Sequence, residues 1–407
     1  MTTTFINARI FDGVSDEYRS DSCVVVDGSR IAEILPHTPT SPSGEVIDVR
    51  GKTLMPGLID AHCHVLGSSV KITEVESQPL TYVSQYARKM LSHALSCGFT
   101  AVRDVGGGDA GIAKAVEDGL IDGPRVYFAG RVLSMTGGHG DFRDPLSGLG
   151  SCQCGTESRV SVIVDGKDAV RAAAREELRR GAHCIKIMMS GGVLSPADPI
   201  WMDQFADEEV LAAIEEARRR RKYVAAHCHP PESIARAARL GVRTIEHATL
   251  IDAMSAAAVK SADAYVVPTL VIVQALLDMS KTDKLPPWVQ GKLAEVSDSC
   301  SRGLELMDRT GLKIGFGTDL LGHLHTQQAR EFVLRREVQS AAAILRAATS
   351  VNADILQEPG LGRIQPGCEA DLLVVDGDPL RDIAVLAQNG QHLDVIMKAG
   401  RLYKSRG

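Results

Sequence analysis

His62 and His64 stand one residue apart after the mainly apolar stretch 58–61, and this spacing suits metal binding. Alternate side chains of a β-strand point to the same face, so both imidazoles would face one ion. A His-x-His pair is not specific by itself, because histidines also occur in cores and on surfaces. Its meaning therefore depends on residues further along the chain.

Lys186 is a second residue in an unusual position, with apolar neighbours on both sides between Cys184 and Met189. A buried ammonium is costly, and its pKa shifts so that the neutral form becomes accessible. A neutral amine can add carbon dioxide to form a carbamate, whose oxygens can bridge two metal ions. Taken alone, the pattern fits equally well a lysine whose ammonium reaches solvent or an ion-pair partner.

Short apolar stretches alternate with longer amphipathic helical stretches through the middle of the chain, which is typical of a parallel α/β architecture. We expect eight strands that close into a TIM-like (β/α)8 barrel. The expected strands are 58–64, 100–104, 126–129, 184–188, 223–227, 244–247, 265–268 and 313–318.

Polar residues stand at the ends of several of these strands. In such a barrel the carboxyl ends of the strands meet at one mouth, so residues distant in sequence come together there. In chain order these residues are His62, His64, Lys186, His227, His247 and Asp319. Every one except the lysine is a metal ligand in its ordinary form, so the sequence predicts a metal site at the mouth.

Both ends of the chain have a different texture, with short strand-like stretches and turn signals such as Asp27-Gly28. We expect strands at 4–11, 22–26 and 30–35, and again within 370–377 and 393–401. The two termini are predicted to build one β-sandwich domain from residues 1–56 and 357–407, leaving 57–356 for the barrel.

The composition is that of a soluble globular protein, with 407 residues, 44% hydrophobic and 24% charged. A formal charge of -6 without a long basic block gives no indication of nucleic acid or an anionic membrane as a partner. No secretory signal or bilayer-length apolar run is visible, so we expect a cytoplasmic protein. The nine scattered cysteines predict no disulfide framework. A small-molecule substrate and a homo-oligomeric assembly are expected.

The motif 56–64, followed by Lys186, His227, His247 and 317–319, resembles the amidohydrolase superfamily in its form with a binuclear metal centre. The stretches 136–141, 186–192 and 318–323 resemble its branch of Xaa-Pro dipeptidases, carboxypeptidase-like enzymes and ochratoxin-type amidases. The resemblance extends over nearly the whole chain, and its motifs are specific as a set.

The resemblance implies that His62, His64 and Asp319 hold one divalent ion, usually Zn²⁺, and that His227 and His247 hold a second. It also implies that Lys186, carboxylated by carbon dioxide to N6-carboxylysine, bridges the two.

Two such ions lower the pKa of a bridging water to give hydroxide, the expected nucleophile. Asp319 would accept the proton of that water and then deliver it to the leaving amine. His139 would help to polarise the carbonyl.

Further residues are expected to contact the substrate. His139 lies in a glycine-rich loop after the third strand, and His229 stands two residues beyond His227. In related enzymes the position of His229 faces the substrate. The full expected set of substrate contacts is His139, His229, Ser190, Gly191, Gly192 and His323.

The leading hypothesis is hydrolysis of an amide or peptide bond in a dipeptide or an N-acyl amino acid with an apolar or aromatic part. A lactonase or carbamate hydrolase would use the same groups. A deaminase of this superfamily usually works with one metal and needs no strand lysine, and a non-catalytic scaffold would have lost ligands. Long segments at 135–165 and 271–298 are expected to roof the pocket, the second with an apolar cover.

Overall fold

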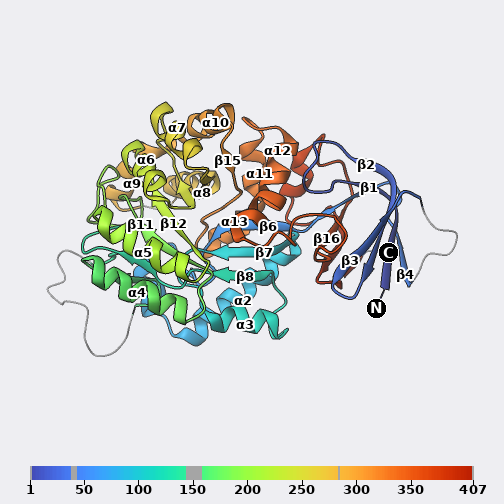
Figure 1. Ribbon diagram of the computed structural model, residues 1–407, viewed down its shortest axis with the longest axis horizontal. Helices are drawn as coiled ribbons and strands as arrows, with labels where there is room; N and C mark the ends of the chain where they lie inside the picture. The colour runs from blue at the N-terminus through green and yellow to red at the C-terminus, as the bar shows by residue number, and fades with distance from the viewer. Residues whose placement is uncertain (1, 38–43, 144–157, 283–284, 406–407) are drawn as a thin grey trace.

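The computed structural model describes residues 2–37, 44–143, 158–282 and 285–405. A body of alternating strands and helices occupies most of the molecule, and a β-domain built from both ends of the chain lies beside it (Figure 1). The predicted α/β barrel with a terminal β-domain is confirmed. The domain boundaries drawn from the sequence stay predictions.

The eight predicted strands form the barrel, with ends that differ by a few residues at most. Two runs of parallel strands, β6-β7-β8 and β11 to β15, are joined at their ends by a few backbone hydrogen bonds. His183 N donates to Phe128 O (2.7 Å), and Ala61 N donates to Phe316 O (2.8 Å), which closes the ring. The barrel strands are β6 (Leu58–Cys63), β7 (Phe99–Asp104), β8 (Arg125–Phe128), β11 (Cys184–Met188), β12 (Tyr223–Cys228), β13 (Thr244–His247), β14 (Tyr265–Val267) and β15 (Lys313–Ile314).

Two short strands were not expected from the sequence. β9 (Val132–Ser134) pairs with β10 (Ser161–Ile163) and touches β11 at one position. With three residues each, they are too short to give a periodic signal. These two strands pair close to the two ends of segment 135–165, which the sequence predicted as part of the roof. Residues 144–157 of this segment lie outside the described residues.

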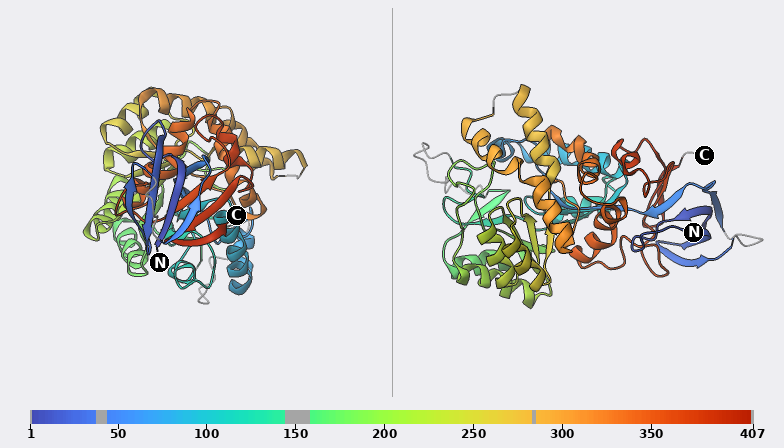
Figure 2. Two further views of the ribbon diagram at one scale, coloured as in Figure 1. Left: turned by 90° about the vertical axis from the view of Figure 1, so that its right-hand side faces the viewer. Right: turned by 90° about the horizontal axis from the view of Figure 1, so that it is seen from above.

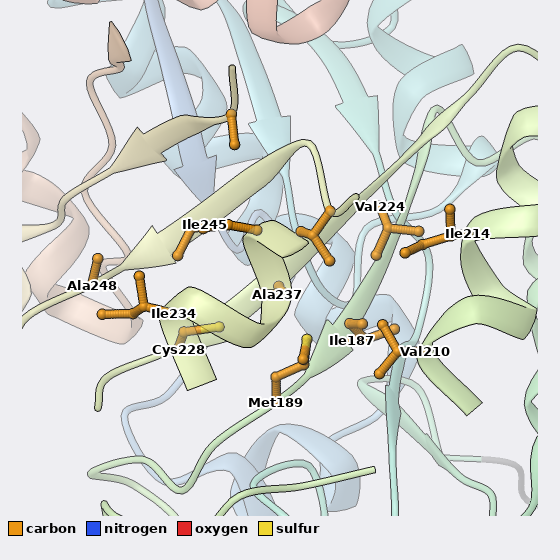
Figure 3. Close-up of a cluster of buried hydrophobic side chains, with 14 of the residues drawn as sticks. Ile187, Met189, Val210, Ile214, Val224, Cys228, Ile234, Ala237, Ile245 and Ala248 are labelled. Carbon is orange, nitrogen blue, oxygen red and sulfur yellow. The ribbon is translucent and has the colours of Figure 1, made fainter. Parts of the chain in front are cut away.

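The barrel strands carry apolar residues on both faces, and helices pack over the outer face, so the strands are buried along their length. Figure 3 shows one such layer, in which Ile187 and Val224 of the strands lie near Val210 and Ile214 of α5. The helices are α1 (Ile72–Ser77), α2 (Leu80–Ser96), α3 (Ala110–Glu117), α4 (Lys167–Arg179), α5 (Asp207–Arg219), α6 (Pro231–Leu240), α7 (Ala253–Ser261), α8 (Leu270–Thr282), α9 (Pro287–Ser297), α10 (Cys300–Thr310), α11 (Glu331–Arg335), α12 (Ala341–Arg346) and α13 (Asn352–Leu356).

The terminal strands form one mixed sheet in the order β18-β17-β16-β5-β1-β2-β3, and β4 pairs with β1. The two ends of the chain meet where β16 runs antiparallel to β5, with Leu372 opposite Pro56. Figure 2 shows these N- and C-terminal strands side by side. The strands are β1 (Thr2–Ile10), β2 (Arg19–Asp27), β3 (Arg30–Leu35), β4 (Glu45–Asp48), β5 (Thr53–Pro56), β16 (Leu372–Val375), β17 (Leu393–Lys398) and β18 (Arg401–Ser405).

Within the described part of the chain, none of the helices combines the length and the apolar character that crossing a membrane requires. The seven described cysteines are all free, as the sequence predicted, and Cys152 and Cys154 lie outside the described residues.

Candidate metal centre

The ends of β6 and of the last barrel strand bring three predicted ligands together. Nε2 of His64 lies 3.0 Å from Oδ1 of Asp319, and Nε2 of His62 lies 3.3 Å from the same oxygen. Ligand atoms of these three residues all lie within 4.8 Å of one another. This spacing suits three ligands around a single cation, as the sequence predicted.

His227 and His247 lie directly beside this trio. Their ring centroids are 4.6 Å apart, and the ring of His247 lies 4.8 Å from that of His62. Nδ1 of His247 lies 3.9 Å from Oδ2 of Asp319, so the carboxylate stands between the two groups of histidines. The predicted second set of ligands therefore adjoins the first.

Each of these four histidines has one ring nitrogen bound to a protein group outside the ligand set. Such a bond fixes the tautomer and leaves the other nitrogen free as a metal ligand. The engaged pairs are His62 Nδ1 with Glu246 Oε2 (2.7 Å), His64 Nδ1 with Gly106 O (2.9 Å), His227 Nε2 with Gly191 O (3.2 Å) and His247 Nδ1 with Thr269 Oγ1 (2.8 Å). This arrangement fits imidazoles prepared to hold cations.

Lys186 is buried on β11, as the sequence predicted, with 2% of its surface exposed. In the described part of the chain, no group accepts a hydrogen bond from its ammonium. Burial lowers its pKa, against the opposing charges of Glu246 and Asp319. Burial therefore makes the neutral amine of Lys186 more accessible than that of an exposed lysine.

Glu246 and Arg103 belong to the site and were missed from the sequence. Burial alone would raise the pKa of Glu246, but the charge of Arg103 outweighs it and the pKa falls well below the usual value. Arg103 Nη2 donates to both Glu246 oxygens at 2.8 and 3.0 Å, and Nε donates to Ala61 O at 2.6 Å. A charged residue inside a fully buried strand was the available signal, the same one that revealed Lys186.

Two residues at the site have unusual backbone conformations. His247 has φ of 68° and Asp319 has φ of 57°, in the left-handed region that residues with a Cβ seldom adopt. Such conformations persist where the surrounding structure holds them, and they gather at functional sites. Asp319 N donates to His62 O (2.8 Å), which ties this turn to β6.

The histidines affect the charge state of Asp319. Burial would raise the pKa of this carboxyl group, but His62, His64 and His247 hold it well below the usual value. Burial lowers the pKa of His227 and His247 well below the usual value, and the pKa of His229 to about 3. The neutral imidazoles of His227 and His247 and the ionised carboxylate of Asp319 are the forms that bind cations. At His64, burial is outweighed by the hydrogen bond and charge of Asp319, which raise the pKa of the imidazole.

The predicted substrate contacts fall into two groups. His139 stacks on His227 with ring centroids 4.2 Å apart, and His229 lies 4.6 Å from His227 and 5.1 Å from His247. Both line the cavity above the ligands. His323 is exposed and lines a neighbouring pocket instead.

The stretch 190–192 supports the site from behind. Ser190 Oγ accepts from His229 N (3.0 Å), while Gly191 N donates to Met202 O and Gly192 N donates to Asp198 Oδ2, both at 3.0 Å. These amides therefore already have protein partners, and substrate contact by them remains only a prediction.

The cavity that contains these residues has mainly apolar walls. Its floor is formed by His64, His227, His247 and Asp319, and α8 supplies Ile272, Val273 and Leu276. The predicted apolar roof is thus present in part, and its further residues Met279, Leu285 and Trp288 line the adjoining pocket.

Residues 53–402 match the model of the amidohydrolase family. The chain belongs to this family. An ochratoxinase of Aspergillus niger is 32% identical over 372 residues, which cover 88% of this chain and 77% of the relative. The resemblance inferred from the sequence motifs is confirmed, and this amidohydrolase is a hydrolase.

Solved structures agree with this assignment over the full length. A prolidase in complex with N-methylphosphonate-L-proline is 42% identical to this amidohydrolase, with a TM-score of 0.96 and complete coverage of both chains. A Xaa-Pro dipeptidase with methionine bound in its active site is 32% identical, with a TM-score of 0.88 and again complete coverage.

Proposed function

We propose that this amidohydrolase uses divalent metal ions to cleave the amide or peptide bond of a small substrate. The substrate class is a dipeptide or an N-acyl amino acid with an apolar or aromatic part. One observation carries the proposal: His64, His227, His247 and Asp319 meet at the floor of an apolar cavity, with His62 directly beside them. Next to them lies the buried Lys186, which has no hydrogen-bond partner among the described residues.

His62, His64 and Asp319 would hold one cation, and His227 and His247 the second. Imidazole and carboxylate ligands suit Zn²⁺, which is our choice of metal. Lys186 would bridge the two as its carbamate, formed when the neutral amine adds carbon dioxide. Its burial and its lowered pKa support this modification.

Metal ions bound here would lower the pKa of a water molecule and polarise the carbonyl of the scissile bond. Asp319 would act as general base and then as general acid, taking the proton of the water and passing it to the leaving amine. Its low pKa keeps the carboxyl group ionised, which is the form that a general base needs. The nitrogen of the scissile bond leaves more easily once it has been protonated, because it then departs as a neutral amine.

His139 is positioned to bind the carbonyl oxygen of the substrate. Its Nδ1 lies 2.7 Å from Ser195 Oγ and 3.5 Å from Asp198 Oδ2, which leaves Nε2 for the cavity. His229 is anchored in a similar way through Nδ1 and Thr249 Oγ1 at 3.0 Å. Both would orient the substrate rather than transfer protons.

The substrate class rests on the apolar walls and on the relatives. Ile272, Val273 and Leu276 would accept an aliphatic or aromatic side chain. Related proteins are a prolidase, a Xaa-Pro dipeptidase and an ochratoxinase. An amide bond beside an apolar group is the chemistry that fits the cavity.

A panel of Xaa-Pro dipeptides, other dipeptides and N-acyl amino acids, offered to Zn²⁺-loaded protein, tests the proposal. The panel should include a lactone, a carbamate and an aminated heterocycle as representatives of the other reaction classes. We expect release of amino acids, loss of activity with a chelator and its return with Zn²⁺. Turnover confined to lactones, carbamates or deamination substrates would contradict the proposal.

A further inference from the structure

A single arginine stands in the wall of the metal-site cavity. Among the described residues that line this cavity, Arg159 is the only lysine or arginine, and it lies near Ile72, Val75 and Val160. His64 and Asp319 line the same cavity. A permanent positive charge therefore stands in the wall of the space where a substrate would lie, a wall that this cavity shares with the neighbouring pocket lined by Gly107 and Glu177.

The guanidinium of Arg159 is held in place without being neutralised. Nη1 donates to Gln78 O (2.8 Å) and to Val75 O (3.4 Å) near the end of α1. In the described part of the chain, no carboxylate pairs with the guanidinium, and Nε and Nη2 have no acceptor.

The carboxylate of Glu76 binds the backbone next to Arg159. Glu76 accepts hydrogen bonds from the backbone amides of Arg159 (3.0 Å) and Val160 (3.0 Å) and from Ser158 Oγ (2.7 Å). The carboxylate thus fixes the backbone at 158–160 to α1 and leaves the guanidinium free. The same contacts limit the positions that the Arg159 side chain can reach.

We propose that Arg159 determines specificity by binding a carboxylate of the substrate. A planar guanidinium with free donors binds a carboxylate with two parallel hydrogen bonds, and apolar surroundings strengthen the attraction.

The assignment rests on the proposed function and adds to it the side chain that would recognise the free carboxylate of the substrate. The substrate is a free acid, such as a dipeptide with its terminal carboxylate or an N-acyl amino acid. Neutral carbamates and lactones lack the group that Arg159 would recognise.

Calorimetry on Zn²⁺-loaded protein tests the assignment without requiring turnover. The probes are L-phenylalanine and L-phenylalaninamide, which differ at the carboxyl group. Arg159→Gln is expected to weaken binding of the acid by about 100-fold and to leave that of the amide unchanged, because a charge-assisted pair is lost. Arg159→Lys keeps the charge without the planar fork, so we expect a loss of about tenfold.

Arg143→Gln is the matched control, because Arg143 lies beside the cavity residue Phe142 but pairs with Asp141. It should bind both probes as the wild type does. The assignment is overturned if wild-type protein does not prefer the acid, or if Arg159→Gln affects both probes alike. If Arg159→Gln fails to fold, unchanged binding by Arg159→Lys overturns it instead.

The two proposals can fail separately. Binding of the acid that depends on Arg159, in a protein that cleaves no amide of the panel, would overturn the proposed function and leave the carboxylate site standing. Amide cleavage that is equally fast for free acids and their carboxamides would do the reverse.

Discussion

Glu246 accepts a buried hydrogen bond of 2.7 Å from Nδ1 of His62, and Arg103 holds the same carboxylate from the other side. The three residues come from β13, β6 and β7, so the contact links strands across the barrel interior. The metal-facing nitrogen of His62 is thereby oriented by a charge pair that does not itself face the cavity.

Glu246→Gln should weaken both metal binding and the fold. We expect metal affinity to fall by about 10- to 100-fold, because His62 loses its anionic partner. The free energy of unfolding of the metal-free protein should fall by about 3 kcal/mol, because Arg103 remains buried without a counter-charge. Metal titration and urea unfolding measure the two effects. Glu215→Gln, at an exposed glutamate, should change neither.

Lys186→Met should separate stability from metal binding. Methionine has a similar size and no charge, so the metal-free variant should be as stable as the wild type or more stable by about 1 kcal/mol. The loaded variant should contain one cation fewer, because the bridging carbamate cannot form. Unfolding curves and metal analysis test this pair of effects. A variant that still holds two cations would show that Lys186 is not a bridge.

Sequence reasoning identified the barrel and the groups at its mouth because both leave strong local signals. Apolar strands that end in histidine or aspartate are visible in the sequence, and parallel strands place those ends together. Glu246 and Arg103 could not be assigned in that way, because their pairing depends on which strands face each other across the interior. The sequence also could not predict how each imidazole is oriented or which groups pair with the Gly191 and Gly192 amides. Both depend on the paths of loops, which have no periodic pattern in the sequence.

Asp319→Asn tests the proton-transfer role while keeping the backbone conformation. Asparagine tolerates the left-handed conformation that residue 319 adopts, so the fold should be retained. We expect kcat/KM to fall by about 1000-fold, as for loss of a general base. Steady-state kinetics with circular dichroism as a folding check measure this. Activity close to that of the wild type would exclude Asp319 from the reaction.

His183 makes the stability of the folded protein depend on pH, independently of the metal centre. Burial and the nearby charge of Lys222 lower its pKa to about 4, and its Nδ1 accepts from Phe128 N at 3.2 Å. Between about pH 6.5 and 4 the unfolded chain binds a proton that the folded chain does not. Stability from this group is therefore present above that window and is lost as the pH falls through it.

His183→Gln removes this titration and keeps an acceptor for Phe128 N. From pH 7 to pH 5, the metal-free wild type should lose about 2 kcal/mol more unfolding free energy than the variant. Urea unfolding at the two pH values measures the difference. Equal losses in both proteins would mean that His183 is protonated as easily in the folded state as in the unfolded chain.

The most direct measurement is a titration of chelator-treated protein with Zn²⁺ in the presence of bicarbonate, while hydrolysis of an N-acyl amino acid is followed. We predict that activity rises until about two ions are bound per chain, as a two-metal site requires. Full activity at one ion per chain, or none at any loading, would contradict the account.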